Sequence, residues 1–214
     1  MAVLAKICGL STPETVSAAL VGGASHVGFN FFAKSPRYID PNVAARLTDP
    51  IRAKRVKICA VTVDPDDALL DRLTAILKPD LIQLHGAETP ARALQIAERT
   101  GAGIIKVISV SESSDILAAS AYESVVDSLM FDTKPPKDAP LPGGNGLRFD
   151  WTMLEGRRFE RPWFLAGGLD PWNVAEAVRL SSAPLVDVSS GVERGPGLKD
   201  PALIAAFLDA VRSV

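Results

Sequence analysis

Cys8 is the residue of this sequence whose type and position best suit chemistry. An apolar run over residues 3–8 ends at this cysteine, directly before Gly9. The same tripeptide recurs as Lys57-Ile58-Cys59, but there the apolar run continues beyond the cysteine. Free cysteine usually packs as a small hydrophobic residue, so core packing is the default for both positions. Cys8 alone is predicted to face a reacting molecule instead of packing in the core.

Other polar side chains stand at or near the ends of later apolar runs. Asp132 follows the run 125–131, where it could act as an acid or base, or only cap a loop through its carboxylate. Gln83 and His85 share one side of a strand by the two-residue period, and a lone histidine more often binds or supports than catalyses. Arg37 follows Pro36, and its planar guanidinium suits a carboxylate, although a surface arginine is the commoner case.

Small residues follow the last two apolar runs. The first of these segments holds Gly167-Gly168, and the second reads Asp187-Val188-Ser189-Ser190-Gly191. Small residues let backbone N–H groups approach an anion, and in (β/α)₈ barrels the loops after strands seven and eight commonly bind phosphate. Each loop alone could be a plain turn. Because both occur at the expected place, we favour phosphate binding.

The elements that would position these residues alternate along the whole chain. Eight strands are predicted at residues 3–8, 26–31, 56–63, 80–84, 103–109, 125–131, 163–166 and 185–188. Helices are predicted at residues 13–21, 41–47, 65–77, 90–98, 115–121, 171–180 and 201–211, many with proline in the first turn. We expect an α/β fold: one (β/α)₈ TIM-barrel domain over residues 1–214, with a parallel eight-stranded barrel.

A doubly wound open sheet is the competing architecture. Against it, the first predicted strand–helix turn lacks the Gly-x-Gly-x-x-Gly pattern of a dinucleotide site. The segment 133–149 carries four prolines and three glycines and is expected to be a functional or disordered loop.

Composition narrows the class of protein. The chain has 214 residues, of which 47% are hydrophobic and 22% charged, with a net charge of −2. These values are ordinary for a globular protein and call for no nucleic-acid or membrane partner. No signal peptide is recognised, so a cytoplasmic location is expected. Two distant cysteines fit neither a disulfide framework nor a zinc site.

Seven motifs stand in order along the chain. They are Lys6-Ile7-Cys8-Gly9, Gly28-Phe29-Asn30-Phe31, Ser35-Pro36-Arg37-Tyr38, Gln83-Leu84-His85-Gly86, Phe131-Asp132-Thr133, Leu165-Ala166-Gly167-Gly168-Leu169 and Asp187-Val188-Ser189-Ser190-Gly191-Val192-Glu193. Taken together, they resemble the phosphoribosylanthranilate isomerase family of tryptophan biosynthesis. That resemblance implies a (β/α)₈ barrel that converts N-(5-phosphoribosyl)anthranilate into 1-(2-carboxyphenylamino)-1-deoxyribulose 5-phosphate without cofactor or metal. A monomer or homodimer that takes a small phosphorylated substrate is expected.

The resemblance also assigns roles to residues. It makes Cys8 the general base and Asp132 the general acid, and it gives Arg37 the anthranilate carboxylate. Phosphate binding is expected at Gly168, Ser189, Ser190 and Gly191, and other substrate contacts at Gln83, His85 and Asp187. One departure is Asn145, where the family often has threonine, and it does not threaten the assignment.

Lys6 is a candidate for the cation that helps ionise Cys8. A cysteine thiol with a pKa of ~8.5 lies about 2 kcal/mol from thiolate at pH 7, and a nearby cation lowers that cost. Lys6 has the same side-chain parity as Cys8, so the hypothesis requires both to face the barrel interior.

Three other functions are alternatives for a chain of this pattern. A histidine-pathway aminoaldose–ketose isomerase typically carries aspartate on the first strand, where this chain has Cys8. Indole-glycerol-phosphate synthase would be expected to have a lysine general acid and an N-terminal extension. A barrel that only binds a phosphorylated metabolite would be expected to lose Cys8 or Asp132, and both are present.

Overall fold

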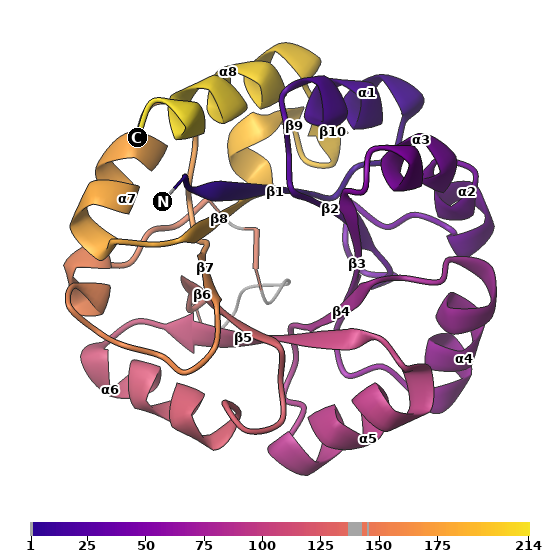
Figure 1. Cartoon of the computed structure of the whole chain (residues 1–214), viewed down its shortest axis with the longest axis horizontal. Coiled ribbons are helices and arrows are strands. Elements are labelled where there is room, and N and C mark those ends of the chain that lie inside the picture. The colour runs from indigo at the N-terminus through magenta and orange to yellow at the C-terminus, as the bar shows by residue number, and fades with distance from the viewer. Residues whose placement is uncertain (1, 137–142, 145) are drawn as a thin grey trace.

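The computed structural model confirms the (β/α)₈ barrel, and it describes residues 2–136, 143–144 and 146–214. Eight parallel strands pair in chain order, and β1 pairs with β8 to close the barrel. Figure 1 looks down this ring of strands, with the helices outside it. The strands are β1 Leu4–Cys8, β2 His26–Asn30, β3 Lys57–Thr62, β4 Leu81–Leu84, β5 Gly103–Val110, β6 Ser128–Thr133, β7 Trp163–Leu165 and β8 Leu185–Val188.

Strand alternation separates two apolar regions. One set of side chains faces the helices, and Ile7, Ile58 and Phe131 belong to its large core. The other set fills the barrel interior with a smaller buried cluster. That inner cluster consists of Cys59, Ile105, Val107, Met130, Phe164, Ala166 and Leu185. Lys6, Cys8, Asp132 and Asp187 have the inward parity, so these polar groups continue the interior toward the carboxyl ends of the strands.

The helices cover the outside of the barrel. They are α1 Pro13–Val21, α2 Pro41–Ala45, α3 Thr48–Ala53, α4 Asp67–Ile76, α5 Pro90–Thr100, α6 Ser113–Ile116, α7 Val174–Ser181 and α8 Pro201–Arg212, with 3₁₀ turns η1 Leu117–Ala121 and η2 Trp151–Leu154. Side chains cap several N-termini. Thr12 forms a capping box at α1, and Asp200 accepts from two N–H groups at α8.

Several predicted boundaries were wrong. The strand predicted at 125–131 begins at Ser128 and runs through Thr133, so Asp132 lies within β6 rather than after it. The helix predicted at 41–47 ends at Ala45, and α3 follows it as a separate helix. The predicted helix 115–121 is a short α-turn that continues as 3₁₀ helix. Each error comes from a local boundary that apolar patterning fixes only loosely.

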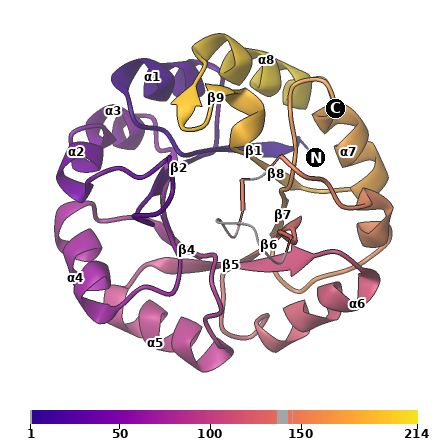
Figure 2. The same cartoon turned by 180° about the vertical axis from the view of Figure 1, so that it is seen from behind.

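A small hairpin after β8 was not predicted at all. The turn η3 Ser190–Val192 leads into β9 Glu193–Gly195, which pairs antiparallel with β10 Leu198–Lys199. Figure 2 shows β9 from behind, between α1 and α8. This hairpin returns the chain past the ends of β1 and β8 before α8 begins. Among the residues described, no helix is long and apolar enough to cross a membrane.

Candidate active site

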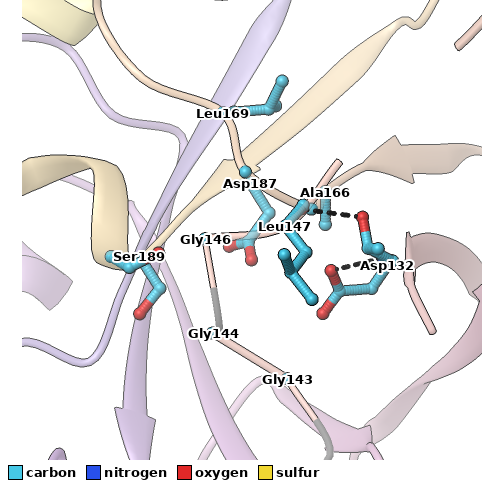
Figure 3. Close-up of a pocket in the computed structure, with 13 residues that line it drawn as sticks. Asp132, Gly143, Gly144, Gly146, Leu147, Ala166, Leu169, Asp187 and Ser189 are labelled. Carbon is cyan, nitrogen blue, oxygen red and sulfur yellow. Dashed lines mark hydrogen bonds between the residues drawn. The ribbon is translucent and has the colours of Figure 1, made fainter. Parts of the chain in front are cut away.

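Two adjoining cavities open at the carboxyl ends of the strands. They enclose about 410 and 490 Å³, including space open to solvent. Asp132, Asp187, Ser189, Gly143 and Gly144 line both, so the two cavities form one site with two ends. Figure 3 shows Asp132, Asp187 and Ser189 around the first cavity, together with Gly143, Gly144, Gly146 and Leu147. That placement agrees with the rule that function in (β/α)₈ barrels lies at this face.

Cys8 and Lys6 meet on the inner face of β1, as their parity predicts. Lys6 is completely buried, and its Nζ donates to Asp187 Oδ1 at 2.7 Å. A Cβ on Gly28 would lie 3.1 Å from both Cys8 Sγ and Lys6 Nζ. Glycine on the neighbouring strand therefore leaves the space that the thiol and the ammonium group share. Cys8 lines the second cavity, whereas Asp187 is placed between the two cavities.

Burial and two nearby cations act in opposite directions on the Cys8 thiol. Burial raises the pKa of the Cys8 thiol, and the cations Lys6 and Lys199 offset only part of that rise. Lys6 is thus a cation that favours the thiolate, in the direction that the hypothesis requires, although burial outweighs it. Burial also opposes the charge of Lys6, yet Asp187 and the two cysteines raise its pKa above the ordinary value.

Asp132 lies next to His85 in the lining of the second cavity. The distance between His85 Nε2 and Asp132 Oδ2 is 3.3 Å, without the alignment of a hydrogen bond. Oδ1 of Asp132 accepts the N–H of Thr133 at 2.8 Å, which fixes the carboxylate. Gln83 Nε2 lies 3.4 Å from His85 Nδ1, and its buried Oε1 has no partner among the described residues. Buried polar atoms of this kind are usually satisfied, so these groups have capacity for a polar ligand.

Arg37 lines the second cavity from the loop after β2 and is held by an ion pair. Its Nε and Nη2 donate to the two carboxylate oxygens of Glu193 at 2.8 and 2.9 Å, and Nη2 also donates to the Gly144 carbonyl. Lys199 Nζ donates to Glu193 Oε1 at 2.7 Å. Burial would raise the pKa of Glu193, but Arg37 and Lys199 lower it below the ordinary value. The guanidinium predicted to bind a carboxylate is therefore held in place by a carboxylate of the protein.

The phosphate loops border the first cavity. Gly168, Ser189 and Ser190 line it, and Gly168 has a φ of 66°, which favours glycine. Asn173 Nδ2 donates to the Gly168 carbonyl at 2.9 Å and fixes this loop at the start of α7. Gly191 does not line either cavity. A Cβ there would overlap the Leu169 carbonyl, so this glycine allows the two loops to pack together.

Sequence reasoning gave no role to three residues that shape the site. Asn30 lines the second cavity from the end of β2. Glu193 and Lys199 bind Arg37 and Ser189 from the hairpin. Glu193 is the last residue of the motif that begins at Asp187, but only the fold shows that β9 turns back toward Arg37. The departure at Asn145 and part of the predicted loop, residues 137–142, lie outside the described residues. Within the described ranges, no cluster of three acidic, histidine or cysteine side chains could hold a metal ion.

Comparisons with known proteins agree with the geometry. The model of the N-(5'phosphoribosyl)anthranilate (PRA) isomerase family matches residues 5–210. The N-(5'-phosphoribosyl)anthranilate isomerase of Caulobacter sp. strain K31 is 67% identical, over 99% of this chain and 100% of that protein. Its counterpart in Caulobacter vibrioides is 65% identical, over 97% of this chain and 95% of that protein.

Solved structures of phosphoribosyl anthranilate isomerases are also similar to this chain. Phosphoribosyl anthranilate isomerase from Thermotoga maritima superposes with a TM-score of 0.88 at 34% identity, over 99% of this chain and 100% of the other. Another solved structure holds a phosphoribosyl anthranilate isomerase in complex with reduced 1-(o-carboxyphenylamino)-1-deoxyribulose 5-phosphate. It has a TM-score of 0.84 and 32% identity, over 99% of this chain and 100% of that chain.

Proposed function

Because the chain belongs to the N-(5'-phosphoribosyl)anthranilate isomerase family and is an isomerase, we propose that Cys8 and Asp132 catalyse its Amadori rearrangement as general base and general acid. The substrate is N-(5-phosphoribosyl)anthranilate, and the product is 1-(2-carboxyphenylamino)-1-deoxyribulose 5-phosphate, a step of tryptophan biosynthesis. One observation carries the assignment to these residues: a single site brings together a thiol, a carboxylic acid, an arginine and two small-residue loops.

The acid step opens the ribose ring. Asp132 would donate a proton to the ring oxygen as the bond from that oxygen to the anomeric carbon breaks, which leaves a Schiff base with the aromatic nitrogen. Its Oδ2 is the oxygen suited to this step, since Oδ1 already accepts the N–H of Thr133. His85 stands beside Oδ2 and, with Gln83, would orient the acid and the opened sugar.

The base step moves the double bond. The Cys8 thiolate would remove the proton from the carbon next to the Schiff base, and the resulting enamine tautomerises to the ketone. No atom is gained or lost, as an isomerisation requires. Lys6 would favour the thiolate because it is a cation on the same face of β1, held by Asp187.

Binding is divided between the two ends of the site. We assign the phosphate to Gly168, Ser189 and Ser190, with Gly191 supporting the loop by its close packing. Arg37 would bind the anthranilate carboxylate, and Asp187 would contact the ribose hydroxyls from between the cavities. We expect the reaction to need no cofactor.

We further propose that the protein is cytoplasmic, that residues 1–214 form one domain, and that the enzyme is a monomer or a homodimer.

Asp132→Asn tests the acid directly. The amide keeps the shape of the carboxylate but cannot donate the proton, so turnover should fall about 10²- to 10⁴-fold. The assay follows the loss of phosphoribosylanthranilate fluorescence. Asp71→Asn removes an exposed carboxylate that pairs with Arg99 and serves as the matched control, with wild-type turnover expected. Near-normal turnover by Asp132→Asn would remove Asp132 from the mechanism.

A second assay of the same protein tests the alternative function, that of a histidine-pathway aminoaldose–ketose isomerase. An aminoaldose substrate of the histidine pathway, supplied in place of phosphoribosylanthranilate, should be turned over far more slowly. Faster turnover of that substrate would contradict the assigned substrate while leaving the isomerase class intact.

A further inference from the structure

A second group of buried charges lies beside the site and neither donates nor accepts the protons of the proposed steps. Glu193 and Lys199 belong to the β9–β10 hairpin, and their side chains are 4% and 0% exposed. Removing charges from water costs free energy unless close partners compensate. The hydrogen-bond partners of Glu193 and Lys199 therefore indicate the function of this buried pair.

Glu193 joins the two binding ends of the site. Its Oε1 accepts from Arg37 Nε at 2.8 Å and from Lys199 Nζ at 2.7 Å, and its Oε2 accepts from Arg37 Nη2 at 2.9 Å. Lys199 Nζ also donates to the Ser189 carbonyl at 2.7 Å and lies 3.1 Å from Ser189 Oγ. A continuous chain of charge-assisted hydrogen bonds thus runs from the guanidinium to the first serine of the β8 loop.

Close packing restricts the movement of the side chains that form these hydrogen bonds. A Cβ on Gly197, at the tip of the hairpin, would lie 2.3 Å from the Pro36 carbonyl, so the hairpin rests directly on the loop that carries Arg37. A Cβ on Gly9 would lie 3.1 Å from Arg37 Cδ and 3.4 Å from Lys199 Cε. Gly9 therefore lets the Arg37 and Lys199 side chains lie against backbone, and Gly197 lets the hairpin approach the Pro36 carbonyl.

The Arg37 guanidinium is only partly committed to partners within the described residues. Its Nε and Nη2 are committed to Glu193 and to Gly144, whereas Nη1 donates to none of the residues that the structure describes. A carboxylate in the second cavity could accept from Nη1 without displacing Glu193. The direction of that N–H group is then set by Glu193.

We propose that Glu193 and Lys199 are positioning residues that fix the span between the Arg37 guanidinium and the Ser189–Ser190 loop, and so select phosphosugars whose arylamine bears a carboxylate at that span. The inference rests on the proposed ligands of Arg37 and of the loop. Glu193 acts through Arg37, and Lys199 acts through Ser189. Fixed spacing of this kind reduces the ordering that binding must otherwise impose.

The test compares equilibrium binding of two stable analogues. One is reduced 1-(2-carboxyphenylamino)-1-deoxyribulose 5-phosphate, and the other is the same molecule without the carboxyl group. We expect the wild-type protein to bind the carboxylate form about 10- to 100-fold more tightly, the range for a hydrogen bond to a charged group. Glu193→Gln should reduce this ratio below about 3-fold and leave the Kd of the other analogue nearly unchanged. Lys199→Gln should weaken both analogues by a similar factor.

Two controls separate positioning from folding. Glu14→Gln changes an exposed glutamate on α1 and should keep the wild-type ratio. If thermal unfolding shows that Glu193→Gln is not folded, Glu193→Asp retains the charge while shortening the reach, and it should lower the same ratio. In an Arg37→Ala background, Glu193→Gln should have no further effect on either analogue.

Each contrary result has a distinct meaning. A ratio that survives Glu193→Gln, or equal weakening of both analogues by it, overturns the inference, since Glu193 would then be dispensable or only structural. A wild-type protein that does not discriminate the analogues overturns both the inference and the role of Arg37. A wild-type protein that discriminates them but does not turn over phosphoribosylanthranilate contradicts the proposed function alone.

Discussion

Two copies of the tripeptide Lys-Ile-Cys lie on either side of β2 and differ in the burial of the lysine and in the access of the cysteine to the cavity. The register pairs Gly28 with both Cys8 and Cys59, and His26 with both Lys6 and Lys57. Lys6 is nevertheless fully buried on Asp187, whereas the side chain of Lys57 is 57% exposed. Cys8 lines the cavity, and Cys59 packs in the inner apolar cluster.

The tilt of the strands explains the difference. In a (β/α)₈ barrel the strands lean by about 36° from the axis, so residues paired across several strands lie at successively different heights. The second tripeptide therefore lies nearer the closed end of the barrel than the first. Two cysteines of the same inward parity thus lie at different levels, where Cys8 lines the cavity and Cys59 packs in the inner cluster.

The comparison is tested most strongly by removing each thiol in turn. Cys8→Ala should lower turnover about 10²- to 10⁴-fold because no other group on β1 can take the proton. Cys59→Ala should keep turnover within about 3-fold of the wild type, since its side chain is completely buried and burial raises its pKa to about 12. Steady-state rates of both variants decide the matter. A large loss in Cys59→Ala, or none in Cys8→Ala, would reverse the assignment.

A smaller effect is expected from the two lysines. Lys6→Gln keeps a donor for Asp187 but removes the cation, so the pKa of the Cys8 thiol should rise further. Each unit of that rise lowers the thiolate fraction near neutral pH about tenfold, and the limb of kcat/KM that climbs with pH should move to higher pH. Lys57→Gln, at the equivalent position of an exposed surface pair, should leave the profile unchanged. Iodoacetamide labelling of Cys8 as a function of pH measures the same titration. An unshifted profile for Lys6→Gln would exclude the electrostatic role.

Sequence patterning was sufficient for the barrel because its strands are apolar runs that alternate with capped helices. It also distinguished Cys8 from Cys59, since only one run stops at its cysteine. It could not give the net effect of Lys6, which depends on burial in three dimensions. The partner of Arg37 was equally hidden: Glu193 is 156 residues away in sequence and reaches Arg37 only because a two-stranded hairpin folds back.

The smallest expected effect concerns stability. Cys59 has no exposed surface and belongs to the inner apolar cluster, so Cys59→Ala should leave a small void and lower the free energy of unfolding by about 1 kcal/mol. Cys8 borders a cavity, and part of its surroundings is already empty, so Cys8→Ala should cost about 0.5 kcal/mol or less. Urea unfolding of both variants gives the comparison. If the two losses were equal, or if Cys8→Ala lost more, the level of each cysteine in the barrel would not account for its packing, and the tilt argument would fail for this pair.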